Sequence, residues 1–158
     1  MIKRLVDRLV LAGGVLAGVS TVLILALVCV EVAARMFNRS TMVADELAGY
    51  LNVGIVFFGL AYTVREGGFI RIELLYERLR GRWLAAVRWF IVATSLLFVL
   101  TLTFFISLHV QYAFVRDTRA ISVLNTPEYI PMTIMVVGCV LLVLQLLMYL
   151  VDRVRTLP

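Results

Sequence analysis

The amino-acid sequence predicts an all-α integral membrane protein with four transmembrane helices. Of its 158 residues, 63% are hydrophobic and only 16% are charged, whereas a soluble domain is nearer half apolar and a quarter charged. Four long runs contain no Asp, Glu, Lys or Arg, and each can cross a hydrocarbon core about 30 Å thick. We therefore expect a single membrane domain over residues 1–158, with no soluble domain.

The first run, Leu9–Val30, has 22 residues, and the second, Leu47–Val64, has 18. Lys3 and Arg4 precede the first run as in a signal peptide, but the run is long for such a peptide and no A-x-A site closes it. We expect a retained helix over about residues 9–34. The second run is the shortest, so its helix should include flanking residues, at about 46–65.

The third run, Trp89–Val115, has 27 residues, and the fourth, Tyr129–Val151, has 23. The third is longer than a bilayer requires, which predicts a helix over about residues 84–115 that tilts or emerges from the membrane. The fourth predicts a helix over about residues 129–151.

Basic residues are distributed unevenly between the two sides of this bundle. Eleven lie before the first run, between the second and third, or after the fourth, against four in the other two loops. The positive-inside rule then predicts that both termini are cytoplasmic and that the loops at about 35–46 and 116–128 are periplasmic. Membrane orientation explains the net charge of +5, so we expect no nucleic-acid partner.

Between the second and third runs, apolar residues recur at helical spacing, with Gly67–Gly68 before them and Gly81 among them. This pattern predicts a short amphipathic helix over about residues 70–80, lying on the cytoplasmic surface against membrane phospholipids. The alternative is that the segment extends the third helix into water. The residues expected to face the membrane, at successive spacings of 3, 1, 3 and 4, are Ile72, Leu75, Tyr76, Leu79 and Trp83.

The sequence does not favour catalysis, because the runs lack the ionisable residues that normally mark a site within a membrane. Glu31 and Arg35 are one turn apart beyond the first run and should form an ion pair at the outer surface. His109 is the sole histidine, so we expect an interhelical hydrogen bond rather than a bis-histidine haem. Cys29 and Cys139 are predicted at different depths, which argues against a disulfide. We expect no enzyme activity, no cofactor and no metal site.

Small and hydroxyl-bearing residues occur within the runs. Gly14 and Gly18 form a G-x-x-x-G pair, which permits close helix approach. Hydroxyl groups in the third run should bond to their own helix or to a neighbour; these are Thr94, Ser95, Thr101, Thr103 and Ser107. The overall pattern is typical of an accessory or scaffold subunit.

Residues in and around the second and fourth runs occur in a characteristic order. The second helix with its flanks reads DELAGYLNVGIVFFGLAYTVREGGFIRIELLYERL and includes Glu46, Tyr50, Gly59, Arg65 and an I-x-[IV]-[DE]-x-[LI] segment at Ile70–Leu75. The stretch that leads into the fourth run reads SVLNTPEYIPMTIMVVG. It includes Ser122, Pro127, Pro131 and Gly138. In this order the chain resembles, over nearly its whole length, the small (Q-type) membrane subunit of tripartite ATP-independent periplasmic (TRAP) transporters. Phe69 departs from the pattern, because many members have His there.

The resemblance implies a non-catalytic small permease subunit of a sodium-driven, binding-protein-dependent symporter for organic anions or similar solutes in the bacterial inner membrane. In such systems a periplasmic substrate-binding protein captures the solute. A large (M-type) membrane subunit carries the substrate and sodium sites and moves as an elevator. The small subunit would pack against the static part of the large subunit and extend it as a scaffold. Its interfacial helix would keep the orientation of this scaffold in the membrane fixed. The transported solute would be selected by the partners.

The resemblance also implies where partners are contacted. The residues expected at family motifs or subunit contacts are Glu46, Tyr50, Gly59, Arg65, Pro127 and Pro131. The arginines of the outer loops either pair with acidic residues of the binding protein or are solvated loop charges; these are Arg35, Arg39, Arg116 and Arg119.

Other function classes fit less well. A self-dimerising four-helix exporter would need a membrane-embedded carboxylate in the first helix, and the first charge-free run has none. A quinone-linked redox enzyme would need cysteine pairs in the outer loops, which contain no Cys. A structural subunit of another membrane complex remains an open alternative.

Overall fold

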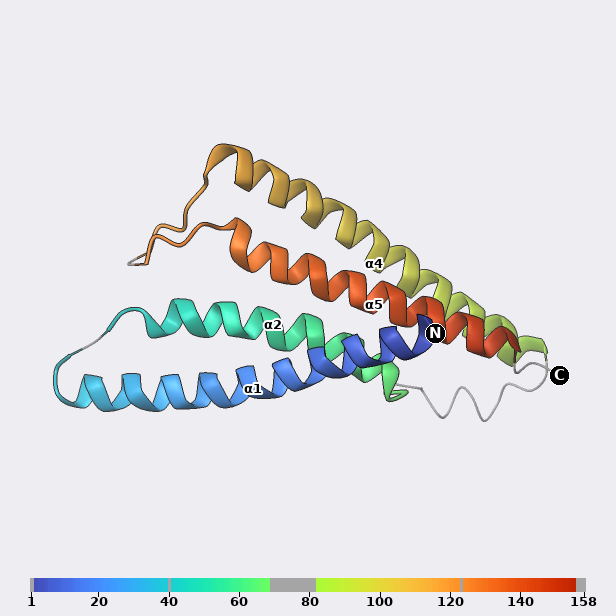
Figure 1. The fold of residues 1–158 in the computed structure, drawn as a ribbon, viewed down its shortest axis with the longest axis horizontal. Coiled ribbons are helices and arrows are strands. Elements are labelled where there is room, and N and C mark those ends of the chain that lie inside the picture. Colours follow the sequence, from blue (N-terminus) through green and yellow to red (C-terminus); the bar gives the residue numbers. More distant parts are fainter. Residues whose placement is uncertain (1, 40, 69–81, 123, 156–158) are drawn as a thin grey trace.

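The computed structural model describes residues 2–39, 41–68, 82–122 and 124–155. In these ranges the chain forms four α-helices and no β-strand (Figure 1). All four helices are long and apolar enough to cross a membrane, so the predicted all-helical, four-span architecture is confirmed. The helices are α1 (Ile2–Met36), α2 (Ala44–Arg65), α4 (Arg82–Arg116) and α5 (Tyr129–Arg155).

The helices extend beyond the charge-free runs, and α1 begins at Ile2 rather than near residue 9. The position at which the hydrocarbon begins along each helix stays a prediction. The amphipathic helix predicted over about residues 70–80 lies outside the described residues, as do Ile72, Leu75, Tyr76 and Leu79. Trp83, the last residue of that predicted face, is the second residue of α4, and its side chain is exposed.

Helices α1, α2 and α4 each end in a Schellman motif, in which the residue after the cap adopts a left-handed conformation. After α1 this residue is Asn38, with φ of 55°. Its N–H donates to the carbonyl of Arg35, and the N–H of Arg39 donates to that of Ala34, both at 3.0 Å. Gly67 occupies the same place after α2, with φ of 75°. Asp117 does so after α4, with φ of 47°. Gly, Asn and Asp tolerate this conformation best, so these residues account for where the helices stop.

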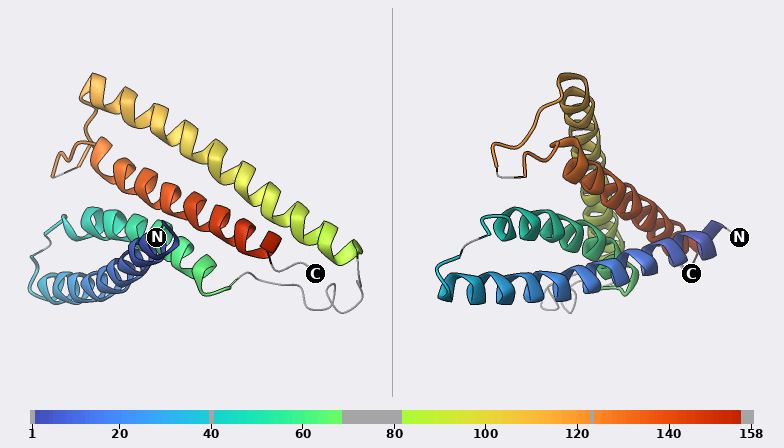
Figure 2. Two further views of the ribbon diagram at one scale, coloured as in Figure 1. Left: turned by 45° about the vertical axis from the view of Figure 1, so that its right-hand side comes forward. Right: turned by 60° about the vertical axis from the view of Figure 1, so that its left-hand side comes forward.

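The helices pack in the spatial order α1, α2, α5, α4, and α1 also touches α5. Figures 1 and 2 show α5 between α2 and α4, with α4 at the edge of the bundle. The described residues of two loops lie at one end, which we call the loop end (Figure 1); they are 37–39 and 41–43 in one loop, and 117–122 and 124–128 in the other. Helix α1 begins, and α5 ends, at the opposite end.

The buried core lies mainly away from the loop end. Val10 of α1 and Leu146 of α5 are 0% and 2% exposed, and Ala61 of α2 is fully buried. Toward the loop end the helices spread apart (Figure 1). Large apolar side chains remain exposed along α1 and α4, as expected of surfaces that meet lipid or another membrane protein; examples are Val22, Leu25, Leu97, Phe98 and Phe104.

Two glycines allow the helices to approach closely. A Cβ atom on Gly138 of α5 would lie 2.5 Å from the Cβ of Phe57 and 3.0 Å from its carbonyl carbon. A Cβ atom on Gly14 of α1 would lie 2.6 Å from Cδ2 of Tyr62. The predicted close approach is found at Gly14 but not at Gly18, because nothing lies within 4 Å of the Cβ position there.

Hydroxyl groups in the middle of α4 bond to their own helix. Thr101 donates to the carbonyl of Leu97 at 2.9 Å, and Thr103 donates to that of Val99 at 2.7 Å. Ser107 likewise donates to the carbonyl of Thr103 at 2.7 Å. The prediction that these hydroxyl groups bond to their own helix is therefore confirmed for Thr101, Thr103 and Ser107. His109 instead stacks on Tyr112 of the same helix, with ring centroids 6.3 Å apart. The described part of the chain offers it no interhelical hydrogen bond, because this face of α4 is exposed.

Candidate functional site

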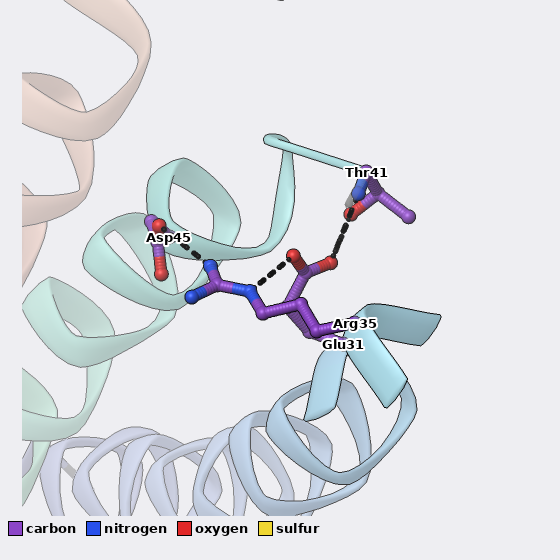
Figure 3. Close-up of polar contacts among 4 residues, drawn as sticks. All are labelled: Glu31, Arg35, Thr41 and Asp45. Carbon is purple, nitrogen blue, oxygen red and sulfur yellow. Dashed lines mark hydrogen bonds and ion pairs between the residues drawn. The ribbon is translucent and has the colours of Figure 1, made fainter. Parts of the chain in front are cut away.

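A buried carboxylate joins α1 to the following loop at the loop end. Glu31 is 5% exposed, and Nε of Arg35 donates to its Oε1 at 2.9 Å. The backbone N–H of Thr41 donates to Oε2 at 3.3 Å, and the Thr41 hydroxyl also donates to that oxygen (Figure 3). Nη2 of Arg35 in turn lies 3.5 Å from Oδ2 of Asp45, in the first turn of α2. The predicted Glu31–Arg35 ion pair is confirmed, but its carboxylate is buried because Thr41 covers it.

The buried charge of this cluster is paired within the chain itself. A buried charge is tolerated when it is paired and hydrogen-bonded, and Glu31 has both kinds of partner. The Arg35 side chain is 54% exposed, so one side of the ion pair meets solvent. The arrangement fixes the turn between α1 and α2.

An apolar groove lies beside this cluster, between the loop-end halves of α1 and α2. Its volume is about 600 Å³, and Glu31 and Thr41 are its polar lining residues. Because these two residues are bonded to each other, the groove presents little that would select a polar solute. Its apolar walls are formed mainly by Leu23, Leu27, Val30, Val43, Leu47 and Leu51.

A second polar cluster joins the start of α2 to the other loop. The hydroxyl of Tyr50 donates to Oε1 of Glu46 at 2.5 Å. The hydroxyl groups of Ser122 and Thr126 face the same carboxylate, although Oε2 is buried and accepts no hydrogen bond within the described ranges. Glu46 and Tyr50, predicted as family-motif or subunit-contact residues, therefore point toward their own chain.

In the loop between α4 and α5, residues 117–122 and 124–128 form the two sides of a short hairpin closed by backbone hydrogen bonds. The N–H of Ala120 donates to the carbonyl of Thr126 at 3.0 Å. The N–H of Glu128 donates to the carbonyl of Thr118 at 3.1 Å. Pro127 forms a bridge with Arg119 across this hairpin.

Pro131 is the third residue of α5, in the first turn, where a helix needs no N–H donor. Pro127 comes just before this helix, and its carbonyl accepts the N–H of Ile130 at 3.2 Å. Both prolines thus shape the entry into α5.

Arg65 lies at the end of the bundle away from the loops. Its Nη1 is 3.1 Å from Oε1 of Glu66, and its guanidinium lies over the ring of Tyr62. Gly59 faces open space, because a Cβ atom there would meet nothing within 4 Å. Its carbonyl accepts the hydroxyl of Thr63 at 2.8 Å.

The remaining outer-loop arginines, predicted either to pair with a binding protein or to be solvated, mostly have partners within the chain. Nη2 of Arg119 lies 3.1 Å from Oδ2 of Asp117. The guanidinium of Arg116 lies 4.5 Å from the centre of the Tyr112 ring. Arg39 is exposed and has no ion pair among the residues that the structure describes. The loop end therefore does not present a row of four free positive charges.

Other reactive groups are scattered. Cys29 is exposed, Cys139 is buried, and both thiols are free. Across residues 2–39, 41–68, 82–122 and 124–155, no three or more His, Cys, Asp or Glu side chains gather in a way that could hold a metal ion.

Sequence reasoning missed three of these contacts. The four-residue spacing of Glu46 and Tyr50 was a usable signal for their hydrogen bond. The bonds from Thr41 to Glu31 cross ten positions, and the approach of Ser122 to Glu46 crosses far more, so neither follows from helical periodicity.

The chain matches the model of a known protein family. The family described as "Tripartite ATP-independent periplasmic transporters, DctQ component" matches residues 24–156. The match includes every candidate residue at both loops and on α2. No curated protein matches the chain.

Proposed function

Because the chain belongs to the DctQ family, the small component of TRAP transporters, we propose that it is the non-catalytic scaffold subunit of a sodium-driven symporter for organic anions or similar solutes. The family is one of transporter components rather than enzymes, and its membership with four spanning helices indicates a multi-pass protein of the bacterial inner membrane. Its partners in such a system are the large membrane (M-type) component and the substrate-binding protein.

The observation that carries the scaffold role is the absence of charge from the four runs. A subunit that binds ions and solute near the midplane normally places ionisable or unwound backbone groups there. Here no Asp, Glu, Lys or Arg interrupts the runs, and the buried Glu31 is neutralised by Arg35 near the loop end. The substrate and sodium sites are accordingly assigned to the large subunit.

The proposed orientation places the loop end in the periplasm and both termini in the cytoplasm. The uneven distribution of eleven against four basic residues supports it, as does the position of both loops at one end of the bundle. The amphipathic segment at about residues 70–80 would then contact phospholipids of the cytoplasmic leaflet and keep the orientation of the scaffold in the membrane fixed.

The loop end is the proposed contact for the substrate-binding protein. Arg39 is the best candidate for an ion pair with it, since the other three arginines have internal partners. The two loops lie at the same end and could be reached by one soluble protein.

Transport by purified components tests this proposal. The large subunit would be reconstituted in proteoliposomes with and without this chain, supplied with the cognate binding protein and its solute, and exposed to a sodium gradient. We expect uptake only when the chain, the binding protein and the gradient are all present. Equal uptake without the chain would overturn the scaffold role.

A further inference from the structure

Helix α2 carries an uncovered face that differs from the other exposed faces of the bundle. Gly49, Asn52, Val56, Gly59 and Thr63 follow one another at spacings of 3, 4, 3 and 4, which places them on one stripe of the helix. We call this stripe the open face of α2. Four of the five residues are exposed and Gly59 is half-buried.

The open face points away from both helices that pack on α2. Phe58 and Tyr62 face the glycines of α1, and Phe57 meets Gly138 of α5. A Cβ atom on Gly49 or on Gly59 would meet nothing within 4 Å. The backbone of α2 is therefore accessible along this stripe, as it is where a second transmembrane helix packs closely.

The chemistry of the open face suits a helix better than lipid. Asn52 follows the first residue of α2 by eight positions, or about 12 Å along the helix, which is well inside the candidate span. Its carboxamide makes no hydrogen bond within the described part of the chain. Hydrocarbon tails cannot supply one, whereas a polar side chain or backbone carbonyl of a neighbouring helix can. By contrast, α1 and α4 expose large apolar side chains such as Leu25 and Phe98.

A second copy of this chain fits the open face poorly. Two copies in one membrane would meet about a two-fold axis along the membrane normal, which places the same residue at the same depth on both sides. Asp45 lies one turn before Gly49 on this stripe, and its side chain is 85% exposed. A second copy would present its own Asp45 at the same depth and no basic residue on this stripe. Each Asp45 would then keep only Arg35 of its own chain, 3.5 Å away, as a partner, and the two like carboxylates would disfavour the contact.

We propose that the open face of α2 is where a transmembrane helix of the large membrane subunit docks. The inference rests on the proposed function and adds the location of the contact. The docking helix would carry small residues opposite Gly49 and Gly59, a hydrogen-bonding side chain at the depth of Asn52, and a basic or polar residue near Asp45. Glu46 and Tyr50, which point toward their own loop, would lie outside this contact.

Photo-crosslinking in membranes that contain all three components tests the location. A benzophenone amino acid would replace Val56 on the open face or, as controls, Val22 of α1 or Phe98 of α4, which are exposed apolar positions on other faces. We expect an adduct with the large subunit from position 56, at least tenfold above either control. An adduct with a second copy, or no protein adduct from position 56 while the large subunit co-purifies, would overturn the location and leave the proposed function standing.

A pair of glycine variants tests the close approach. Gly59→Leu should lower the amount of large subunit recovered with the chain at least tenfold, because the added side chain occupies the space of the docking helix. Gly18→Leu is the matched control, since its Cβ position on α1 is equally open, and recovery should stay within twofold of the unmodified chain. Equal recovery with both variants would overturn the inference. Failure of the unmodified chain to recover any large subunit would overturn the proposed function as well.

Discussion

Replacing Gly138 with alanine should force α2 and α5 apart. The new Cβ atom would lie 2.5 Å from the Cβ of Phe57 and 3.3 Å from its Cα. The nearest atoms belong to the base of the side chain and to the backbone, so no rotamer change of Phe57 relieves the clash. Restoring an ordinary carbon–carbon separation of about 3.5–4.0 Å requires the helices to separate by about 1 Å at this point.

The expected cost follows from two opposing terms. Overpacking a close contact costs about 1–3 kcal/mol, while alanine is favoured over glycine in a helix by about 0.5–1 kcal/mol. Gly138→Ala should therefore lower the free energy of unfolding by about 0–2.5 kcal/mol, the difference between those ranges. Gly18→Ala gains the same helix preference without a clash, because nothing lies within 4 Å of its Cβ position. The two variants should differ by the overpacking term alone, about 1–3 kcal/mol.

Unfolding in mixed micelles measures this difference. Dyes placed on α2 and α5 report separation of the two helices by energy transfer as sodium dodecyl sulfate is added, and the transition midpoint gives the relative stability. Gly138→Ala should unfold at a lower detergent fraction than Gly18→Ala. Coincident transitions for the two variants would refute the close contact between α5 and Phe57.

Three further predictions concern the loop end. Glu31→Ala removes the acceptor for the Thr41 and Arg35 donors and should lower the free energy of unfolding in the same titration by about 1–3 kcal/mol; an unchanged midpoint would contradict a structural role for this carboxylate. Glu46→Ala should loosen the hairpin at residues 117–128 and speed tryptic cleavage after Arg119 several-fold, and a cleavage rate equal to that of the unmodified chain would argue against the contact. In a background lacking native cysteines, an impermeant maleimide should label Asn125→Cys in intact spheroplasts and label Arg4→Cys only after permeabilisation; the reverse pattern would invert the proposed orientation.

The four helices could be predicted because their signal is local. A helix in lipid satisfies its own backbone hydrogen bonds, so an uninterrupted apolar run such as Trp89–Val115 is sufficient to predict one. The Glu31–Arg35 ion pair could be predicted for the same reason, since its partners are one turn apart. The left-handed residues that end α1 and α4, Asn38 and Asp117, are types that favour that conformation.

Contacts between segments could not be predicted in this way. The sequence placed Gly138 in a family motif, but its approach to Phe57 depends on how α5 is rotated and shifted along α2, which periodicity does not specify. The G-x-x-x-G spacing likewise predicted close helix approach at both Gly14 and Gly18. Of the two, only Gly14 lies close to another helix.

The approach of Glu46 to the hairpin could not be predicted from the sequence either, although its spacing from Tyr50 was a usable signal for their hydrogen bond. Its position in a motif suggested a contact with another subunit, whereas the structure turns it toward Tyr50 and the hairpin. A family motif identifies a residue that matters to the family, and the structure is needed to decide which partner it faces.

Purification of the chain from its native membrane tests the central claim most directly. The chain would carry a C-terminal tag and be extracted in mild detergent, and the proteins that follow it would be identified and quantified by mass spectrometry. The scaffold account predicts one large, many-helix membrane protein in near-equal amount. A chain that purifies alone, or only with copies of itself, would contradict the account.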